Sequence, residues 1–482
     1  MRVGVVSRML AAVIGIVAFF LIPGLIMAAL DGHRSVALAF LATMLGSWVF
    51  AAVVLSVSRG HAGELGVRGG FLVVSLSWAG SALVGAFPFF LSGAIPSFAD
   101  AYFESMSGFT TTGASILQDI EALSPALLLW RSTTHWLGGM GIIVLSVAVL
   151  PLLGIQGGQL VKAEAPWPTV DKITPKITST AKILWLVYIG LTIAQIVLLL
   201  FGGLDLFDAV THTFGTMATG GFSPKNTSVA HYDSAYVDAV ITVFMVLAGT
   251  NFLLHYAVIT RRFDKLSSDT EFKAYITIFV GSVLLLTLFL MLDGSYGAGS
   301  GLRFASFQAA SILTTTGFVT ADYDLWPQAA RVVLLCLMFV GGSAGSTGGG
   351  IKVARIVTMF KQAMNEFRHL SHPRGVFPIS YNRAPMARRM VIAITSFVFL
   401  YLVIILLSAL VISLEDVSIL TALSAALATL GNIGPGFEAV GPTANYAFFS
   451  EPMKWFLSFL MMAGRLELYT VLVLFSPAFW RY

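Results

Sequence analysis

Charged side chains are scarce in this sequence, because only 11% of its 482 residues are Asp, Glu, Lys or Arg. Soluble globular domains carry about 25% charged residues, so the composition excludes an ordinary soluble protein. The formal net charge is small, +4. Since no soluble basic region is available to bind nucleic acid, we expect no nucleic-acid partner.

Cysteine and catalytic motifs are equally scarce. The single cysteine, Cys336, lies in an apolar run and cannot form an internal disulfide. The sequence contains no HExxH motif, no nucleotide-binding loop and no cluster of carboxylates within the apolar runs. These absences disfavour a multi-span enzyme, and we expect neither catalysis nor a covalently bound cofactor.

Long apolar runs are what the sequence has in abundance. Hydrophobic residues make up 57% of the chain, and the mean hydropathy is +0.86. Runs of about 20 apolar residues are long enough to cross a bilayer. The first run is too long for the apolar core of a signal peptide, so we expect it to be retained. The expected spans are 9–30, 36–58, 70–93, 130–153, 183–203, 236–260, 274–292, 329–360, 390–413 and 452–476.

Four shorter apolar stretches lie between these spans, at 98–111, 205–218, 304–315 and 416–429. They are too short to cross and are predicted to be re-entrant helices. The charges support this, because most Lys and Arg then fall on the cytoplasmic side and most Asp and Glu outside. The sequence therefore predicts a multi-pass membrane protein with both termini in the cytoplasm.

A fourfold internal repeat follows the first two spans. Each unit contains a span, a short re-entrant helix, a Thr-Gly element and a second span. The elements are Thr112-Gly113, Thr219-Gly220, Thr316-Gly317 and Thr429-Leu430-Gly431. We therefore divide the chain into an N-terminal helix pair, 1–69, and four units, 70–182, 183–273, 274–389 and 390–482.

This repeated element has the properties of a pore loop. An ion that enters a bilayer must exchange its water for oxygen ligands, and backbone carbonyls of an extended loop supply them. Irregular backbone is tolerated at that depth only where it is buried or lines a water-filled cavity. A single Thr-Gly pair would be a helix C-cap, but four copies between spans are not explained in that way. The predicted fold is all-α, with four loops around one pseudo-fourfold pore.

The stretch 341–350 contains six glycines in ten residues, halfway along the expected span 329–360. Each interior glycine costs a helix about 1 kcal/mol relative to alanine, so a continuous helix is disfavoured. We interpret the stretch as an unwound loop that blocks the pore below the filter. Close helix packing through small residues is the alternative. A phosphate-binding loop is excluded, because Ile351 separates the last glycine from Lys352.

Arg465 lies midway along the last expected span. A central arginine is costly in a membrane, so it should face a polar partner or water. We expect it to bind free carbonyls of the glycine-rich loop and to repel cations while the pore is closed. An ion pair with a residue on another helix is the alternative. Glu467 is a poor partner, since it would lie on a different face of the same helix.

Taken together, the four loops, the glycine-rich stretch and the segment GRLELYT at 464–470 resemble the TrkH family of the Trk/Ktr/HKT superfamily of potassium transporters. The resemblance covers essentially the whole chain. The two spans before the first repeat are typical of TrkH rather than of the shorter KtrB-type subunits. The resemblance implies a homodimer in the bacterial inner membrane, with one pore in each subunit.

The resemblance also implies the ion-binding residues. The expected filter consists of Thr111, Thr112, Gly113, Ala218, Thr219, Gly220, Thr315, Thr316, Gly317, Thr429, Leu430 and Gly431. The four glycines match the filter glycine of each repeat, and glycine at all four positions is associated with potassium selectivity. Ala218 and Leu430 depart from the TTTG form, but only a backbone carbonyl is needed there. The expected gate consists of Gly345, Gly348, Gly349, Gly350 and Arg465.

The predicted function is potassium uptake through a channel-like pore, with potassium as the substrate. A symporter that couples potassium entry to protons or sodium is the alternative, because such transporters also contain broken helices. The resemblance implies a cytosolic nucleotide-binding subunit of the TrkA type, so we expect any nucleotide on that partner. Basic cytoplasmic residues could dock this partner or anionic lipid: Arg368, Arg374, Arg383, Arg388 and Arg389.

Overall fold

Helices make up nearly all regular structure in the computed structural model, which describes residues 3–58, 66–141, 177–382 and 384–481. The described strands are β1 (Ser380–Tyr381) and β2 (Ala384–Pro385), which pair antiparallel. The second half of the expected span 130–153 and the basic residue Arg383 lie outside the described residues. The all-α membrane fold expected from the sequence is confirmed.

Within the described ranges, six segments are long and apolar enough to cross a membrane. They agree with the expected spans at 9–30, 36–58, 70–93, 183–203, 274–292 and 390–413. The segments are α1 (Val3–Phe19) with α2 (Ile22–Leu30), α3 (Arg34–Val57), α4 (Val67–Leu91), α9 (Ile177–Phe201), α14 (Thr270–Leu292) and α18 (Arg388–Ile412).

The expected spans 236–260, 329–360 and 452–476 are not single straight helices. The first is α11 (Ala235–Ala248) followed by α12 (Phe252–Ile259), bent by 102°. The last is α20 (Glu451–Arg465) followed by α21 (Tyr469–Leu472), with a bend of 114°. Glycine permits these breaks: a Cβ on Gly464 would collide with the carbonyl of Leu430.

The glycine-rich stretch interrupts the remaining one of these three segments. Helix α16 (Gln328–Met338) ends before it, and α17 (Val353–Ser371) begins after it. The corresponding helix of the first repeat, α6 (Pro125–Gly139), also ends at a pair of glycines. The expectation of a continuous span is therefore wrong for 236–260 and 452–476, whereas 329–360 is interrupted at the glycine-rich stretch, where the sequence disfavours a continuous helix.

All four predicted re-entrant stretches form short helices. They are α5 (Phe98–Phe109), α10 (Leu206–Ala218), α15 (Ala298–Leu313) and α19 (Ile419–Leu430). Three begin at a side chain that caps a free backbone N–H, as at Asp205, whose carboxylate accepts from the amide of Asp208 at 2.7 Å. Their 12 to 16 residues are too few to cross a bilayer.

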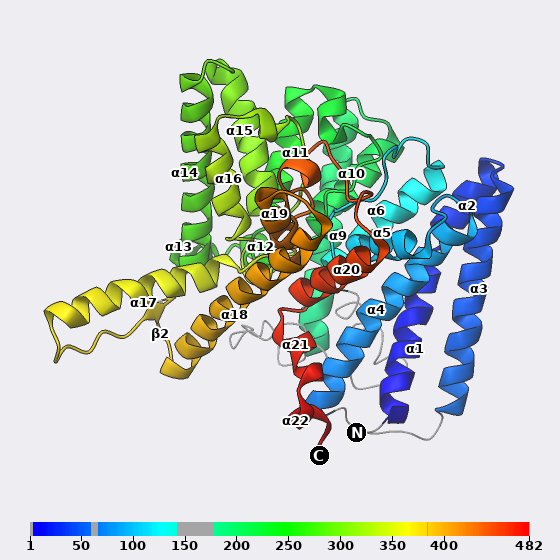
Figure 1. Cartoon of the computed structure of the whole chain (residues 1–482), viewed down its shortest axis with the longest axis horizontal. Helices are drawn as coiled ribbons and strands as arrows, with labels where there is room; N and C mark the ends of the chain where they lie inside the picture. The colour runs from blue at the N-terminus through cyan, green and yellow to red at the C-terminus, as the bar shows by residue number, and fades with distance from the viewer. Residues whose placement is uncertain (1–2, 59–65, 142–176, 383, 482) are drawn as a thin grey trace.

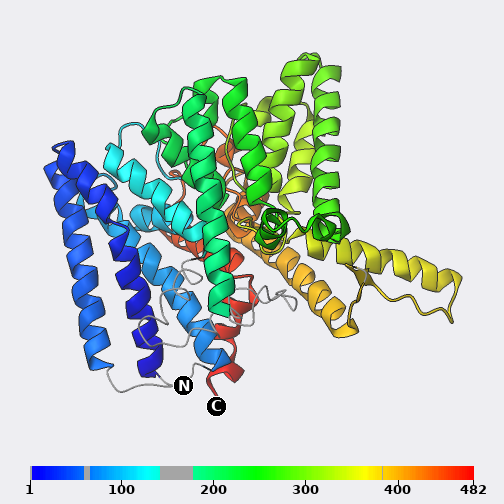
Figure 2. The same ribbon diagram turned by 180° about the vertical axis from the view of Figure 1, so that it is seen from behind.

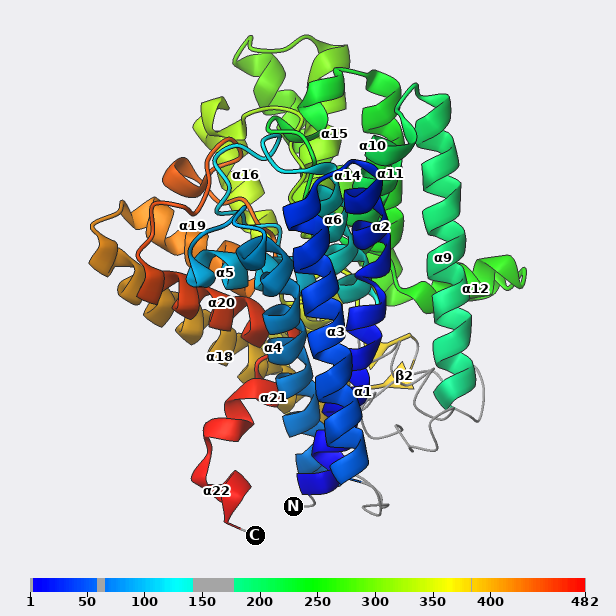
Figure 3. The same ribbon diagram turned by 90° about the vertical axis from the view of Figure 1, so that its right-hand side faces the viewer.

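The N-terminal helices and α17 lie at opposite ends of the molecule (Figure 1). Helices α1, α3 and α4 run side by side, as Figure 3 shows, whereas α17 extends away from the body together with the β1–β2 turn. Helix α9 crosses the side seen in Figure 2, over the central helices. The start of α1 and the terminal helix α22 (Pro477–Trp480) lie at the same end of the molecule (Figure 3).

Candidate ion pathway

Each pore helix ends in the same left-handed turn. The turn residue has a φ between 54° and 60° in all four repeats: Thr111, Thr219, Thr315 and Asn432. The next amide then donates to the carbonyl five residues earlier, at 2.8–2.9 Å: Thr112 to Ser107, Gly220 to Gly215, Thr316 to Ser311 and Ile433 to Ala428. This bond closes the end of a helix in a Schellman-type turn, so the four repeats are superimposable residue by residue here.

A glycine with positive φ follows two residues after each turn residue. These glycines are Gly113, Gly221, Gly317 and Gly434, with φ from 81° to 97°. Side chains other than glycine rarely adopt this conformation. A Cβ on each glycine would also lie within 3.0 Å of a carbonyl oxygen of the neighbouring loop, namely Gly220, Thr316, Ile433 and Thr112 in that order. The contacts run from loop 1 to 2, 2 to 3, 3 to 4 and back to 1, so the loops form a closed ring.

The ring corrects the register expected for two repeats. Gly221, not Gly220, is equivalent to Gly113, and Gly434, not Gly431, is equivalent to Gly317. Gly431 still has the helical φ of −79°, because α19 continues through Leu430.

Some of the other expected filter residues lie in the turn or loop, and the rest belong to the last turn of a pore helix. Thr111, Thr112, Thr315 and Thr316 lie in the turn and loop, where all are buried. Thr219 is the turn residue of the second repeat, whereas Ala218 is still helical. Thr429 and Leu430 also belong to the last turn of their helix, and the Thr429 hydroxyl donates to the Ala425 carbonyl at 2.7 Å.

Threonine hydroxyls within the loops form hydrogen bonds with one another as well as with carbonyls of the pore helices. The hydroxyls of Thr110 and Thr112 lie 2.8 Å apart, and those of Thr314 and Thr316 lie 2.7 Å apart. Asn432 takes a different role in the fourth repeat. Its amide donates to the Thr112 hydroxyl at 3.0 Å, which links the last loop to the first. Asn432 is not among the residues expected from the sequence, although asparagine tolerates a left-handed turn better than most residues.

The glycine-rich loop lies against the ends of the third and fourth pore helices. The amide of Gly349 donates to the Thr315 hydroxyl at 2.6 Å. A Cβ on Gly349 would collide with the carbonyl of Gly431, and one on Gly348 would lie 3.0 Å from that of Thr314. The loop thus contacts the residues that immediately precede the ring.

The two arms of this loop cross one another. A Cβ on Gly350, where φ is 75°, would lie 2.7 Å from the Gly341 Cα. The carbonyl of Gly345 accepts from the amide of Phe252 at 3.0 Å, at the start of α12. The loop is therefore a folded element attached to the break between α11 and α12, and the alternative of a tightly packed continuous helix does not hold.

Two positively charged side chains, Arg465 and Lys352, contact this loop. Arg465 donates to the carbonyl of Thr347 at 2.7 Å, and to those of Gly138 and Gly139 at 2.7 and 3.0 Å. The two glycine carbonyls belong to the end of α6, where helix carbonyls lack intrahelical partners. Buried Lys352 donates from Nζ to the carbonyl of Gly348. Lys352 is not among the gate residues expected from the sequence.

Glu271, at the start of α14, joins the glycine-rich loop to the first turn of α17. Its Oε1 accepts from the amides of Ala344 at 2.7 Å and Ala354 at 3.0 Å. Its Oε2 accepts from the hydroxyl of Tyr381 at 3.2 Å. Glu467 pairs with the guanidinium of Arg355, on α17. Because α20 ends at Arg465, Glu467 is not on that helix and can face α17.

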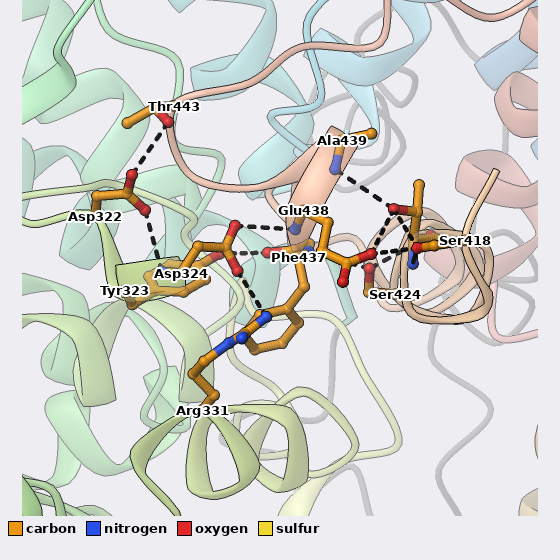
Figure 4. Close-up of polar contacts among 12 residues, drawn as sticks. Asp322, Tyr323, Asp324, Arg331, Ser418, Ser424, Phe437, Glu438, Ala439 and Thr443 are labelled. Carbon is orange, nitrogen blue, oxygen red and sulfur yellow. Dashed lines mark hydrogen bonds and ion pairs between the residues drawn. The ribbon is translucent and has the colours of Figure 1, made fainter. Parts of the chain in front are cut away.

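Beyond the ring, the segments of the third and fourth repeats are joined by the contacts in Figure 4. Tyr323 donates from its hydroxyl to the carbonyl of Gly436 at 2.8 Å. Asp324 accepts from the amide of Glu438 at 2.9 Å and pairs with Arg331 at 3.3 Å. Burial raises the pKa of Asp324 above its ordinary value, an effect that Arg331 opposes.

Four re-entrant helices whose loops close into one ring define a pore-loop membrane transport protein. The atoms of each loop that lie against the next loop are backbone carbonyl oxygens. The model of the TrkH family, described as cation transport protein, matches residues 38–482. The chain therefore belongs to the TrkH family.

Several relatives support this membership along the whole chain. The Trk system potassium uptake protein TrkH of Salmonella typhimurium is 40% identical, covering 96% of this chain and 95% of the relative. The Trk system potassium uptake protein TrkG of Escherichia coli K12 is 34% identical, covering 100% and 99%. The crystal structure of the potassium transporter TrkH from Vibrio parahaemolyticus has a TM-score of 0.89 at 36% identity, over 100% of both chains.

Proposed function

We propose that this chain takes up potassium ions through the ring formed by its four loops. The closed cycle of glycine–carbonyl contacts is the observation that carries this proposal. It leaves no space for side chains between the loops, so carbonyl oxygens supply the ligands that replace the water around the ion. Relatives 40% identical to the chain are named potassium uptake proteins.

The filter then consists of the loop residues in the corrected register. These are Thr112, Gly113, Gly220, Gly221, Thr316, Gly317, Ile433 and Gly434. The turn residues before them, including Thr111, Thr219 and Thr315, orient the carbonyls at the inner end. The units 70–182, 183–273, 274–389 and 390–482 each contribute one loop, and the pair 1–69 packs beside the first.

The glycine-rich loop acts as the gate in this proposal. It contacts the inner side of the ring through Gly348 and Gly349. Arg465 and Lys352 place two positive charges beside it, and a permeating cation would be repelled by both. Gly345 and Gly350, both with positive φ, are the positions at which the loop can change direction.

The family resemblance supplies the proposed setting. The chain works in a bacterial inner membrane as a homodimer, with both termini in the cytoplasm. A cytosolic nucleotide-binding subunit of the TrkA type controls the gate, and this chain itself binds no nucleotide. Helix α17 offers an apolar surface for such contacts, since Phe360 and Phe367 are each 64% exposed and Leu370 is 80% exposed.

Ion flux through purified protein in liposomes tests this function. Potassium, rubidium, sodium and lithium are supplied separately, and the reversal potential is measured in gradients of each. We expect reversal near the potassium equilibrium potential, unaffected by an imposed sodium or proton gradient. A reversal potential that follows either of those gradients would indicate a symporter instead.

A further inference from the structure

A buried carboxylate holds the chain immediately beyond the first filter glycine. Glu104, in the middle of α5, is 1% exposed. Its oxygens accept from the Ser115 hydroxyl at 3.0 and 3.1 Å and from the Ile116 amide at 3.0 Å. Ser115 and Ile116 follow Gly113 by two and three residues, so Glu104 fixes the outer end of loop 1.

The partner of this carboxylate contacts the second loop. Arg131, on α6 and 2% exposed, lies with Nε 2.6 Å from Glu104 Oε1. The same guanidinium donates to the carbonyl of Ser223 at 2.9 Å and lies 3.5 Å from the ring centre of Phe222. Phe222 and Ser223 directly follow Gly221. The ion pair therefore connects the segments that leave two adjacent filter glycines.

His135, one turn further along α6, strengthens the same connection. Its ring stacks on Phe222 with centres 4.0 Å apart, and its Nε2 accepts from the Phe222 amide at 3.1 Å. Nε2 must be unprotonated to accept, so Nδ1 carries the proton and donates to the Gly108 carbonyl at 2.7 Å. A Cβ on Gly220 would collide with this ring. His135 thus joins the end of pore helix 1 to loop 2.

The four repeats differ at the position of Glu104. Counted from the turn residue, the equivalent residues are His212, Gln308 and Ala425. His212 Nε2 lies 3.0 Å from the Ser223 hydroxyl, and Gln308 donates to the Thr320 hydroxyl at 3.5 Å. His212 and Gln308 therefore contact the outer segments of their own repeats through a hydroxyl group. Glu104 is the acidic member of the set, and through Arg131 it reaches the neighbouring repeat.

We propose that Glu104, Arg131 and His135 are positioning residues that set the preference for potassium over sodium by fixing loop 2 against loop 1. Selectivity depends on the size of the carbonyl cavity or on the number of carbonyls that face the ion, and how neighbouring loops lie against one another affects both. Charge-assisted hydrogen bonds between buried groups resist such movement more strongly than neutral ones. This inference rests on the proposed function, because it assumes that the ring conducts potassium.

The test compares Glu104→Gln, the double variant Glu104→Gln with Arg131→Met, and His135→Leu in liposomes. The double variant removes both charges, so no unpaired buried charge remains to prevent folding. In each we expect potassium flux per folded protein to persist, while the permeability ratio of potassium to sodium falls at least about fivefold, as for the loss of one or two charge-assisted hydrogen bonds.

Arg303→Gln is the matched control. Arg303 joins pore helix α15 to α11 through Asp238 at 2.7 Å, and its other contacts are with Asp233 and the Phe304 ring. These partners do not follow a filter glycine, so this variant should lose thermal stability but keep the permeability ratio. A wild-type ratio in the folded double variant would overturn the positioning role. Absence of potassium flux in the unaltered protein would instead overturn the proposed function.

Discussion

At the scale of single residues, the fourth loop contains two candidates for the filter glycine, Gly431 and Gly434. Gly434 has a φ of 97°, and a Cβ there would collide with the carbonyl of Thr112. Gly431 has a φ of −79°, which alanine adopts readily, and a Cβ there would lie 2.6 Å from the Leu427 carbonyl of its own helix and 3.0 Å from the Ile433 side chain. Gly434 lies in the ring, whereas Gly431 lies at the end of the pore helix. Substitutions at the two positions therefore distinguish a residue of the filter from a residue of the helix end.

We therefore expect Gly434→Ala to reduce the potassium-to-sodium permeability ratio roughly tenfold, which corresponds to about 1.4 kcal/mol of lost discrimination. Gly431→Ala should change the ratio less than about twofold, because its φ is negative and its Cβ would meet the last turn of its own helix, not a carbonyl of a neighbouring loop. Reversal potentials of both proteins in liposomes, at equal amounts of folded protein, provide the measurement. A larger effect of Gly431→Ala would return the filter to the register read from the sequence.

Asp324 provides a second prediction at this scale, through pH. Burial raises the pKa of its carboxyl in the folded protein. A raised pKa means that the folded state binds the proton more tightly than the unfolded state, so Asp324 stabilises the fold most below its ordinary pKa of about 4. This stabilisation is lost as pH rises through the higher folded pKa.

Asp324→Asn should consequently flatten the dependence of the melting temperature on pH above about 4, because the titrating group is gone. Melting curves of detergent-solubilised protein from pH 4 to 7 measure this effect. The network in Figure 4 suggests Thr443→Val as the control, since Thr443 donates to the neighbouring Asp322 at 3.4 Å and does not titrate. Parallel pH curves for the unaltered and Asp324→Asn proteins would contradict the prediction.

Residue register was only partly predictable from the sequence. In the first and third repeats a single glycine follows a run of threonines, and this glycine, Gly113 or Gly317, is the one with positive φ. The second repeat has adjacent glycines, Gly220 and Gly221, and sequence alone does not say which adopts the positive φ. In the fourth repeat the helix continues to Leu430, and the turn falls on Asn432. The length of a helix is decided by packing, which a Thr-Gly pattern does not contain.

At the scale of elements, the four short helices could be predicted from apolar length alone, and all four are present. The breaks in the second helices were harder to predict, apart from the glycine-rich stretch. A single glycine, such as Gly249 or Gly464, interrupts a span only because another element lies too close for a side chain. Which element approaches the glycine depends on the tertiary structure. Hydropathy averages over such a break and therefore predicts one continuous span.

The gate belongs to this scale, because it depends on how one loop is held between two broken helices. Arg465 connects the Thr347 carbonyl to the end of α6. Arg465→Ala should raise basal potassium flux roughly tenfold, since several charge-assisted hydrogen bonds to the loop are lost. Shortening 345–350 should raise it at least as much. The two changes should be strongly non-additive, because they remove the same contact.

Flux per folded protein in liposomes, for both single changes and the double, decides this prediction. Arg331→Gln is a suitable control, because Arg331 pairs with Asp324 at the outer segment and not with the loop. Reduced flux and poor folding in Arg465→Ala would mean that the arginine only holds the helices together. Unchanged basal flux in well-folded single variants would place the gate elsewhere.

At the scale of the whole molecule, the repeats determine which side of the membrane each loop faces. In the proposed topology each pore helix enters and returns on the same side of the membrane, so each repeat contributes two crossings rather than three. Asn226, beyond the second loop, contacts the outer segment of the first repeat: its amide donates to Asp119 at 2.9 Å and its side-chain oxygen accepts from the Ile120 amide at 2.7 Å. Ser267, in α13 (Phe263–Ser268), follows the break after α11 and lies near Asp269, which binds Asn382 at 3.1 Å.

This arrangement predicts opposite labelling of the two sites in intact cells. A cysteine at Asn226 should react with a membrane-impermeant maleimide added outside, whereas one at Ser267 should react only after the membrane is permeabilised. The exposed native cysteine, Cys336, is first replaced by serine, so that each protein carries a single thiol. If both sites reacted from outside, α10 would have to cross the membrane completely. Its 13 residues span only about 20 Å as a helix, short of the roughly 30 Å of hydrocarbon, so we expect the two sites to differ.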